Sequence, residues 1–277
     1  MADKADFHDA DATAAQEPSG PSAGQASSSP GGSAGSGGGR NLPVPGQLSA
    51  GKYLIEAELS RSGQGIVFKA YSKVLDRHTA LKVPLAQGPA GDEASWHEEA
   101  RRLCDLAHPN IVRVLDAGSA EGTPYVATEL IEGLPLGDYV RQKPLRARQI
   151  LHWMIQLVDA LAAIHAKGIT HRDLKPGNVI VRSDGRPVLI DFGISTRVTA
   201  YGPEPQAGSA GTVAWMAPEQ ARPDAAVDHR ADIFAMGGIL KFLMSGTSPY
   251  GHMASREEYL RAARTAQVER VPAGPAG

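Results

Sequence analysis

The spacing of apolar residues changes near Gly133, and this change constrains the fold more than any other feature of the chain. Before this point, short apolar runs predict strands, and one longer segment, residues 92–106, predicts a helix between the third and the fourth strand. The predicted strands are residues 53–59, 66–71, 79–85, 111–116 and 125–130. This pattern predicts a small, mainly antiparallel β-lobe with a single helix.

After Gly133 helical spacing dominates, and Gly168 is the predicted C-terminal cap of the longest helix. The predicted elements are a helix at residues 146–166, strands at 179–182 and 187–190, and helices that begin near Asp228 and Arg256. The fold class is therefore predicted to be α+β. A β-rich first lobe covers about residues 50–132, and a larger, mainly helical second lobe covers about residues 133–277.

The first 49 residues differ in composition from the rest of the chain. The stretch at residues 27–39 consists almost entirely of glycine, serine and alanine, with one proline. Such a sequence has too few apolar side chains to offset the entropy lost on ordering. Residues 1–49 are therefore predicted to be a disordered tail that acts as a flexible arm, and residues 50–277 a folded domain.

Charge and cysteine content exclude several classes of protein. The formal net charge of −2 argues against a nucleic-acid partner, because such proteins are usually strongly basic. Cys104 is the only cysteine, so no internal disulfide can form. The sequence contains neither a secretory signal nor the roughly 20 apolar residues that a membrane span needs. A cytoplasmic location is expected.

The run His-Arg-Asp-Leu-Lys-Pro-Gly-Asn at residues 171–178 is the strongest candidate for a functional site. It contains Asp173, Lys175 and Asn178, and Asp191 follows later in the chain. The oxygen atoms of Asn178 and Asp191 are suitable ligands for Mg²⁺, which is a hard cation. Aspartate and asparagine also occur in turns for purely conformational reasons, and that alternative stands beside the functional one.

Two further motifs follow in order: Asp-Phe-Gly at residues 191–193 and Ala-Pro-Glu at residues 217–219. The three motifs resemble the catalytic loop, the metal-binding loop and the end of the activation segment of protein kinases. The resemblance covers roughly residues 50–265 and is similar in style to the eukaryotic-like (Hanks-type) serine/threonine kinases of bacteria. It implies a two-lobed protein-kinase-like fold that transfers the γ-phosphate of Mg-ATP to Ser/Thr hydroxyls of protein substrates.

The resemblance also implies a role for individual residues. Asp173 would accept the proton of the substrate hydroxyl, and Lys175 would offset charge at the γ-phosphate. Asn178 and Asp191 would hold Mg²⁺. Lys82 matches the lysine that holds the α- and β-phosphates and pairs with a helix glutamate.

Two neighbouring glutamates could supply that partner. Alignment on His-Pro-Asn at residues 108–110 selects Glu99. Glu98 would face about 100° away around the helix. Either could instead belong to a solvated helix face.

The loop that would cover the phosphates departs from the kinase pattern G-x-G-x-x-G-x-V. Ser60 and Ser62 replace the first two glycines, whereas Gly65 and Val67 match the pattern. Serine is small and can hydrogen-bond, so we expect the loop still to cover the nucleotide. The phosphate-covering segment comprises Ser60, Arg61, Ser62, Gly63, Gln64, Gly65, Ile66 and Val67.

An adenine pocket follows from the same resemblance, and its walls are also expected to be core surfaces. Thr128 stands before the hinge, where it would gate a back pocket. The roof is assigned to Leu59, Val67 and Ala80, the floor to Ile180, and the adenine-bonding backbone groups to Glu129 and Ile131.

Two other functions are weighed against a protein kinase. Small-molecule kinases of related fold typically lack Lys175-Pro176 and the Ala-Pro-Glu segment, and Thr212 resembles the threonine that lines a hydroxyl-substrate site. A catalytically weak pseudokinase that serves as a nucleotide-binding scaffold would explain the two missing glycines. Such proteins have usually lost at least one charged catalytic group, and this sequence retains all of them.

Arg172 suggests regulation, because a phosphate on the activation segment often pairs with an arginine at this position. The candidate acceptors are Ser195, Thr196, Thr199, Tyr201 and Ser209. The alternative is a loop with ordinary surface hydroxyls.

Asp232 resembles a family aspartate that braces the catalytic loop. The family pattern continues with two or three helices beyond this sequence, so either the protein is longer than this sequence or its second lobe is incomplete.

Overall fold

The computed structural model describes residues 43–62, 65–85, 102–120, 123–191 and 210–270. The chain divides into two units, Met1–Gly39 and Arg40–Gly277, and every described residue belongs to the second. Most of the predicted tail therefore lies outside the described residues. Its last two residues, Leu48–Ser49, form strand β1.

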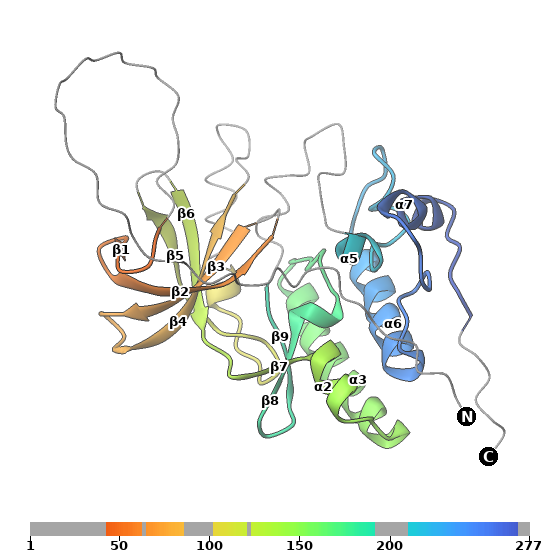
Figure 1. Ribbon diagram of the computed structural model, residues 1–277, viewed down its shortest axis with the longest axis horizontal. Coiled ribbons are helices and arrows are strands. Elements are labelled where there is room, and N and C mark those ends of the chain that lie inside the picture. The colour runs from red at the N-terminus through yellow and green to blue at the C-terminus, as the bar shows by residue number, and fades with distance from the viewer. Residues whose placement is uncertain (1–42, 63–64, 86–101, 121–122, 192–209, 271–277) are drawn as a thin grey trace, which may run out of the picture. The chain divides into compact units, whose positions relative to one another are not determined.

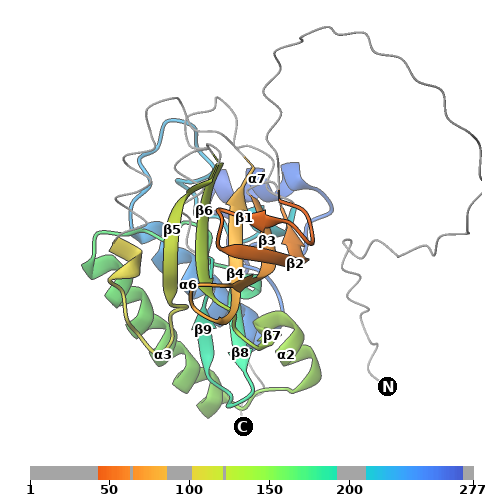
Figure 2. The same ribbon diagram turned by 90° about the vertical axis from the view of Figure 1, so that its left-hand side faces the viewer.

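Six strands form one antiparallel sheet in the order β1-β2-β3-β4-β6-β5 (Figures 1 and 2). The remaining strands of this sheet are β2 (Tyr53–Arg61), β3 (Gly65–Ser72), β4 (Arg77–Pro84), β5 (Val114–Ala120) and β6 (Thr123–Glu129). Side chains alternate between the two faces, as the period of a strand requires. One face forms a core that includes Tyr53, Ile66, Phe68 and Leu81.

The opposite face of the same sheet carries predicted site residues. Val67 on β3 lies directly opposite Lys82 on β4, and Ala80 on β4 lies opposite Thr128 on β6. All four side chains are half-buried. The alternation that buries one set of side chains in the core therefore directs the other set to the candidate site.

The fourth strand begins later than predicted. Residues 111–116 are the predicted range, whereas β5 begins at Val114. The preceding residues pair elsewhere, because the N–H of Val112 donates to the carbonyl of Leu189 and the N–H of Leu189 donates to the carbonyl of Asn110. This segment thus joins the first lobe to the second.

The helix predicted at residues 92–106 is described only in its last part. Helical structure extends to Cys104, and residues 86–101 lie outside the described residues. Leu106 is buried beyond the end of the helix and belongs to the large core cluster that also contains Trp153 and Leu157.

Three helices frame the second lobe: α2 (Leu136–Gln142), α3 (Ala147–Ala166) and α6 (Arg230–Ser245). The buried side of α3 carries Trp153, Leu157 and Ile164 at helical spacing. Gly168 follows α3 with φ +69° and donates its N–H to the carbonyl of His165, so the predicted cap is confirmed. Gly246 ends α6 in the same left-handed conformation.

Two further helices complete the described part of this lobe: α5 (Ala210–Val213) and α7 (Arg256–Arg264). The start of α7 is fixed by Ser255, whose hydroxyl accepts the N–H of Glu258. Glu258 in turn accepts the N–H of Ala254. The two bonds hold the chain at the start of α7, and the helix begins at the predicted residue.

A small antiparallel sheet lies between the first lobe and the helices. It consists of β7 (Gly133–Pro135), β8 (Val179–Arg182) and β9 (Pro187–Leu189) in that order. A short 3₁₀ helix, η1 (Pro176–Asn178), leads directly into β8. Because β7 pairs with β8, this sheet holds both ends of residues 136–178, the segment that contains the candidate catalytic loop.

The structure agrees with the predicted α+β, two-lobed class. Within the described ranges, no helix is long and apolar enough to cross a bilayer.

Candidate active site

The loop between α3 and β8 brings together the three groups predicted from the sequence. Asp173 and Asn178 are buried, and the side-chain Nδ2 of Asn178 donates to the carbonyl of Asp173 at 2.7 Å and to its carboxylate Oδ2 at 3.1 Å. The Nζ of Lys175 lies 3.0 Å from the same Oδ2 and donates to the hydroxyl of Thr212 at 3.0 Å. The carboxylate of Asp173 is thus held in one orientation beside a cation.

Asp232 on α6 supports this loop through hydrogen bonds to its backbone, as the sequence predicts. Its carboxylate is 1% exposed and accepts the backbone N–H groups of His171 and Arg172, each at 2.8 Å. It also lies 2.8 Å from Nε2 of His165. Three hydrogen bonds to one buried carboxylate fix the backbone just before Asp173.

The backbone at Arg172 has φ +64°, a conformation that is costly for a residue with a side chain. Its N–H is held by Asp232, and its carbonyl accepts the side-chain amide of Gln220 at 2.8 Å. Local strain of this kind persists only where the surroundings enforce it. No motif in the sequence indicates this contribution of Gln220.

Lys82 and Asp191 meet at the boundary of the two lobes. The Nζ of Lys82 forms an ion pair and hydrogen bond with Oδ1 of Asp191, and both side chains are partly shielded from solvent. Asp191 has φ +64° and follows Ile190, whose N–H donates to the carbonyl of Asn178 at 2.9 Å. The two predicted metal-ligand residues therefore belong to one hydrogen-bonded unit.

Gly65 is required in the phosphate-covering segment by close packing. A Cβ atom added there would lie 2.8 Å from the carbonyl oxygen of Val83 on the neighbouring strand. The backbones of Ser62 and Gly65 exchange hydrogen bonds at 2.9 and 3.3 Å, and the Ser62 hydroxyl also donates to the Gly65 carbonyl. Ser62 therefore closes the turn between β2 and β3.

The other residues of this segment take different positions. Ile66 is fully buried in the core of the first lobe, so its side chain lies on the opposite face of the sheet from that of Val67. Leu59, the predicted roof residue, is 49% exposed. Arg61 is exposed and pairs with Glu58. Gly63 and Gln64 lie outside the described residues.

The predicted hinge follows β6. The N–H of Glu129 donates to the carbonyl of Arg113 at 2.9 Å, and its carboxylate accepts the N–H of Arg113 at 3.1 Å. The Thr128 hydroxyl donates to the carbonyl of Glu129. Ile131 is buried in the large core. The carboxylate bond between Glu129 and Arg113 fixes the hinge to the preceding segment, and sequence reasoning missed it.

The hinge then crosses close to β8. A Cβ atom added at Gly133 would lie 2.3 Å from the carbonyl oxygen of Val181 and 2.8 Å from Cγ2 of Ile180. Glycine at this position lets β7 approach β8, which carries Ile180, the predicted floor residue. The spacing between hinge and floor therefore depends on the absence of a side chain at Gly133.

Several predicted residues lie outside the described part of the chain. Glu99, the preferred partner of Lys82, is among them, as is the competing Glu98. The five candidate phosphate acceptors at residues 195–209 are also outside it.

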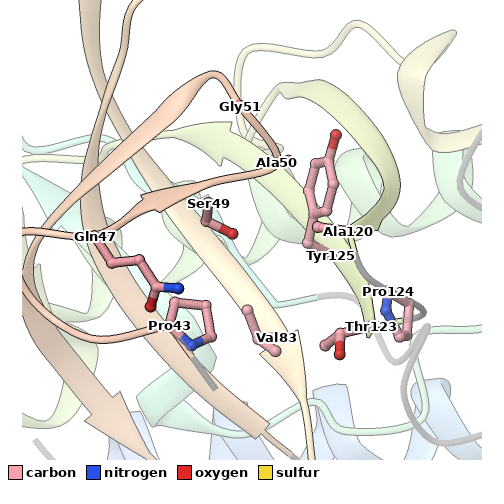
Figure 3. A pocket seen from close by; sticks show the side chains of 10 residues that line it. All are labelled: Pro43, Gln47, Ser49, Ala50, Gly51, Val83, Ala120, Thr123, Pro124 and Tyr125. Atoms are coloured by element: carbon pink, nitrogen blue, oxygen red, sulfur yellow. The ribbon is translucent and has the colours of Figure 1, made fainter. Parts of the chain in front are cut away.

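A cavity of about 250 Å³ lies in the first lobe, away from these residues (Figure 3). It is lined by the turn around Ala50 and by residues of β4, β5 and β6 such as Val83, Ala120 and Tyr125. None of the predicted nucleotide-binding or catalytic residues lines it. This cavity is therefore separate from the candidate active site.

An ion pair beside this cavity anchors the start of β2. Asp116 lies 2.6 Å from Nζ of Lys52 and accepts the hydroxyls of Tyr53 at 2.7 Å and Tyr125 at 3.1 Å. Burial alone would raise the pKa of Asp116, but the hydrogen bonds from these three residues outweigh it and hold the pKa below its usual value. Burial, together with Asp116, raises the pKa of Tyr53 far above its usual value.

A family model of the protein kinase domain matches residues 53–274. The chain belongs to the protein kinase family. The predicted resemblance is therefore confirmed, and with it the two-lobed kinase fold.

The relatives of this kinase domain include several bacterial serine/threonine kinases. Serine/threonine-protein kinase pkn3 of Myxococcus xanthus is 39% identical over 218 residues, which is 74% of this chain and 40% of the relative. Pkn1 of the same organism is 35% identical over 242 residues, 82% of this chain and 33% of the relative. PrkC of Bacillus subtilis is 33% identical over 209 residues, 74% of this chain and 32% of the relative. The chain thus spans about a third to two fifths of the length of these three relatives.

Proposed function

We propose that this kinase domain transfers the γ-phosphate of ATP to serine or threonine hydroxyls of protein substrates. The observation that carries the proposal is the cluster of Asp173, Lys175 and Asn178 on one braced loop, next to the Lys82–Asp191 pair. Phosphoryl transfer requires positioning and charge neutralisation more than covalent chemistry. Two carboxylates, each paired with its own lysine, and the amide of Asn178 meet both requirements.

Asp173 is proposed as the group that accepts the hydroxyl proton of the substrate. As that proton moves to Asp173, the hydroxyl oxygen forms a bond to the γ-phosphorus, and the bond from the γ-phosphorus to the bridging oxygen of ADP breaks. Lys175 lies beside the carboxylate and offsets negative charge on the transferred group. Its contact with Thr212 supports a hydroxyl substrate at this position.

The residues present fit a bound Mg²⁺. Asn178 uses Nδ2 for both of its side-chain bonds to Asp173, so its Oδ1 can act as a ligand. Asp191 supplies a carboxylate, and phosphate oxygens and water would complete an oxygen shell of the kind Mg²⁺ prefers. When bound, the ion neutralises charge on the phosphates. Lys82, which pairs with Asp191 here, would then turn toward the α- and β-phosphates.

The wider setting is also proposed. Protein substrates and ATP are the expected partners, and nucleic acid is not, because the net charge is −2. A cytoplasmic location is supported by the need for ATP and by a single cysteine, which can form no internal disulfide. Regulation by phosphorylation of a hydroxyl among residues 195–209, with the phosphate pairing with Arg172, is also proposed.

Mass spectrometry after incubation with Mg-ATP and a generic substrate protein tests the function. The wild type should phosphorylate serine or threonine, and Asp173→Asn should lose at least about a hundredfold in rate, as expected for loss of a general base. Asp184→Asn, in the exposed turn between β8 and β9, is the matched control and should retain the wild-type rate. Nucleotide binding without phosphate transfer by the wild type would favour the pseudokinase alternative.

A further inference from the structure

Gln220 connects two segments that lie far apart in the sequence. It follows the Ala-Pro-Glu motif, and its side-chain Oε1 accepts the N–H of Ala217 at 2.9 Å while its Nε2 donates to the carbonyl of Arg172 at 2.8 Å. The first partner can only donate and the second can only accept, so the orientation of the amide is unambiguous. Both ends of the amide are therefore used, one on its own turn and one on the catalytic loop.

The bond to Arg172 acts on the peptide group that joins Arg172 to Asp173. A peptide group is rigid, so fixing its carbonyl also fixes the direction of the N–H and the Cα atom of Asp173. The preceding peptide group is held by Asp232, which accepts the N–H of Arg172 at 2.8 Å. Arg172, with φ +64°, lies between these two groups and keeps its costly conformation while both are held. Gln220 therefore supplies one of the backbone contacts that hold the catalytic loop just before Asp173.

The turn that carries Gln220 is itself anchored. On its N-terminal side, the hydroxyl of the buried Tyr250 donates to the carbonyl of Met216 at 2.6 Å. On its C-terminal side, Nε of Arg264 donates to the carbonyl of Ala221 at 2.9 Å. A side chain can position another group only if its own backbone is fixed. The contacts on either side of Gln220 meet this condition.

Close packing alone does not hold the catalytic loop against this turn. A cavity of about 20 Å³ lies between them, and its lining includes Arg172, Asp173, Thr212 and Gln220. A space of this size can hold about one water molecule. The position of the loop therefore depends on directional bonds, namely that from Gln220 to Arg172 and that from Lys175 to the hydroxyl of Thr212 at 3.0 Å.

We propose that Gln220 is a positioning residue for phosphoryl transfer. It holds the peptide group between Arg172 and Asp173 so that the carboxylate of Asp173 faces the substrate hydroxyl, and it does not itself contact the reacting atoms. Asn178 and Lys175 fix the carboxylate from the side-chain end, and Gln220 fixes it from the backbone end. The inference rests on the proposed function, in which Asp173 accepts the proton of the substrate.

Steady-state kinetics of the 277-residue chain at pH 8, with casein as the substrate, tests the inference. Gln220→Glu keeps an oxygen for the N–H of Ala217 but places its second oxygen against the carbonyl of Arg172. Its kcat should fall about five- to tenfold, the effect of losing about one hydrogen bond, while the KM for ATP stays within about twofold. Gln142→Glu, the same exchange at the exposed end of α2, is the control and should keep the wild-type kcat. An unchanged kcat for Gln220→Glu would overturn the inference.

Hydrogen exchange tests the same inference without relying on phosphate transfer. In Gln220→Glu, exchange at the N–H groups of Arg172 and Asp173 should accelerate about fivefold or more, whereas exchange in the middle of α3 should not change. Unchanged exchange at Arg172 and Asp173, or an equal acceleration in α3 that shows general destabilisation, would overturn the inference even if kcat falls. A wild type that transfers no phosphate would overturn the proposed function, and the exchange rates would still decide whether Gln220 holds the loop.

Discussion

Replacing Asp232 by asparagine tests the idea that one buried carboxylate holds the catalytic loop. The carboxylate accepts hydrogen bonds from the N–H groups of His171 and Arg172, and a third contact joins it to His165. Asparagine offers only one oxygen, and its NH₂ group cannot accept. In either orientation of the amide, a buried N–H group therefore loses its partner.

The size of the effect follows from these contacts. An unpaired buried donor costs about 1–3 kcal/mol, and the remaining bonds weaken because the acceptor is no longer charged. We expect Asp232→Asn to lower the free energy of unfolding by about 3 kcal/mol. For a domain of this size the melting temperature would fall by about 6–12 °C.

Catalysis should suffer as well, because Arg172 holds its strained backbone only while its N–H and carbonyl are both bonded. We expect kcat to fall by at least about tenfold while the KM for ATP changes little, since each 1.4 kcal/mol of lost transition-state stabilisation is a factor of ten. The assays are urea unfolding and peptide phosphorylation, with Asp184→Asn as the exposed control. A loss below about 1 kcal/mol together with an unchanged kcat would refute the reasoning.

Three further changes can be checked by nucleotide binding and by unfolding experiments. Gly133→Ala should weaken ATP binding in a fluorescence titration and lower the free energy of unfolding by about 1–3 kcal/mol, because the new Cβ would lie 2.3 Å from the carbonyl oxygen of Val181. Unaltered ATP binding would contradict the proposed hinge geometry. Asp116 has a pKa lowered from 3.8, so its contribution to stability is present above that pH and lost as pH falls through the folded-state value. Acid unfolding of Asp116→Asn should therefore depend less steeply on pH below about 4, and identical curves would argue against this ion pair. Glu269→Gln should lower the free energy of unfolding in urea by about 1–3 kcal/mol, because the buried amine of Lys241 loses the carboxylate 2.7 Å away. An unchanged free energy of unfolding would show that the other two partners of Lys241, Thr247 and the carbonyl of Ser248, are sufficient.

The sequence could predict those parts of the fold in which local pattern and packing agree. The helix at residues 147–166 and its glycine cap follow from apolar spacing and from the left-handed backbone that Gly168 adopts. The start of β5 could not be predicted, because residues 110–112 pair with Leu189, which is distant in sequence. Long-range pairing of this kind leaves no local signal, and an apolar run alone cannot indicate which strand it joins.

The candidate site likewise contains residues that the sequence predicts and residues that it does not. Motif spacing identifies Asp173, Lys175 and Asn178, and the structure brings them within hydrogen-bonding distance of one another. The supports of the loop are harder to find. Gln220 holds the carbonyl of Arg172 from 48 residues away. A side-chain amide that bonds a distant backbone group has no characteristic spacing, so only the folded chain reveals it.

Asp232 and Ile233 are consecutive residues of α6, yet they face in different directions. Asp232 accepts the backbone N–H groups of the catalytic loop, whereas the side chain of Ile233 is 55% exposed. One helical turn therefore serves the chemistry on one side and the solvent boundary on the other. If binding on the Ile233 side were to move this turn, the loop would move with it, because two backbone N–H groups of the loop bond to Asp232. Thermodynamic linkage then requires the reverse, so occupation of the nucleotide site would alter the affinity of whatever binds outside.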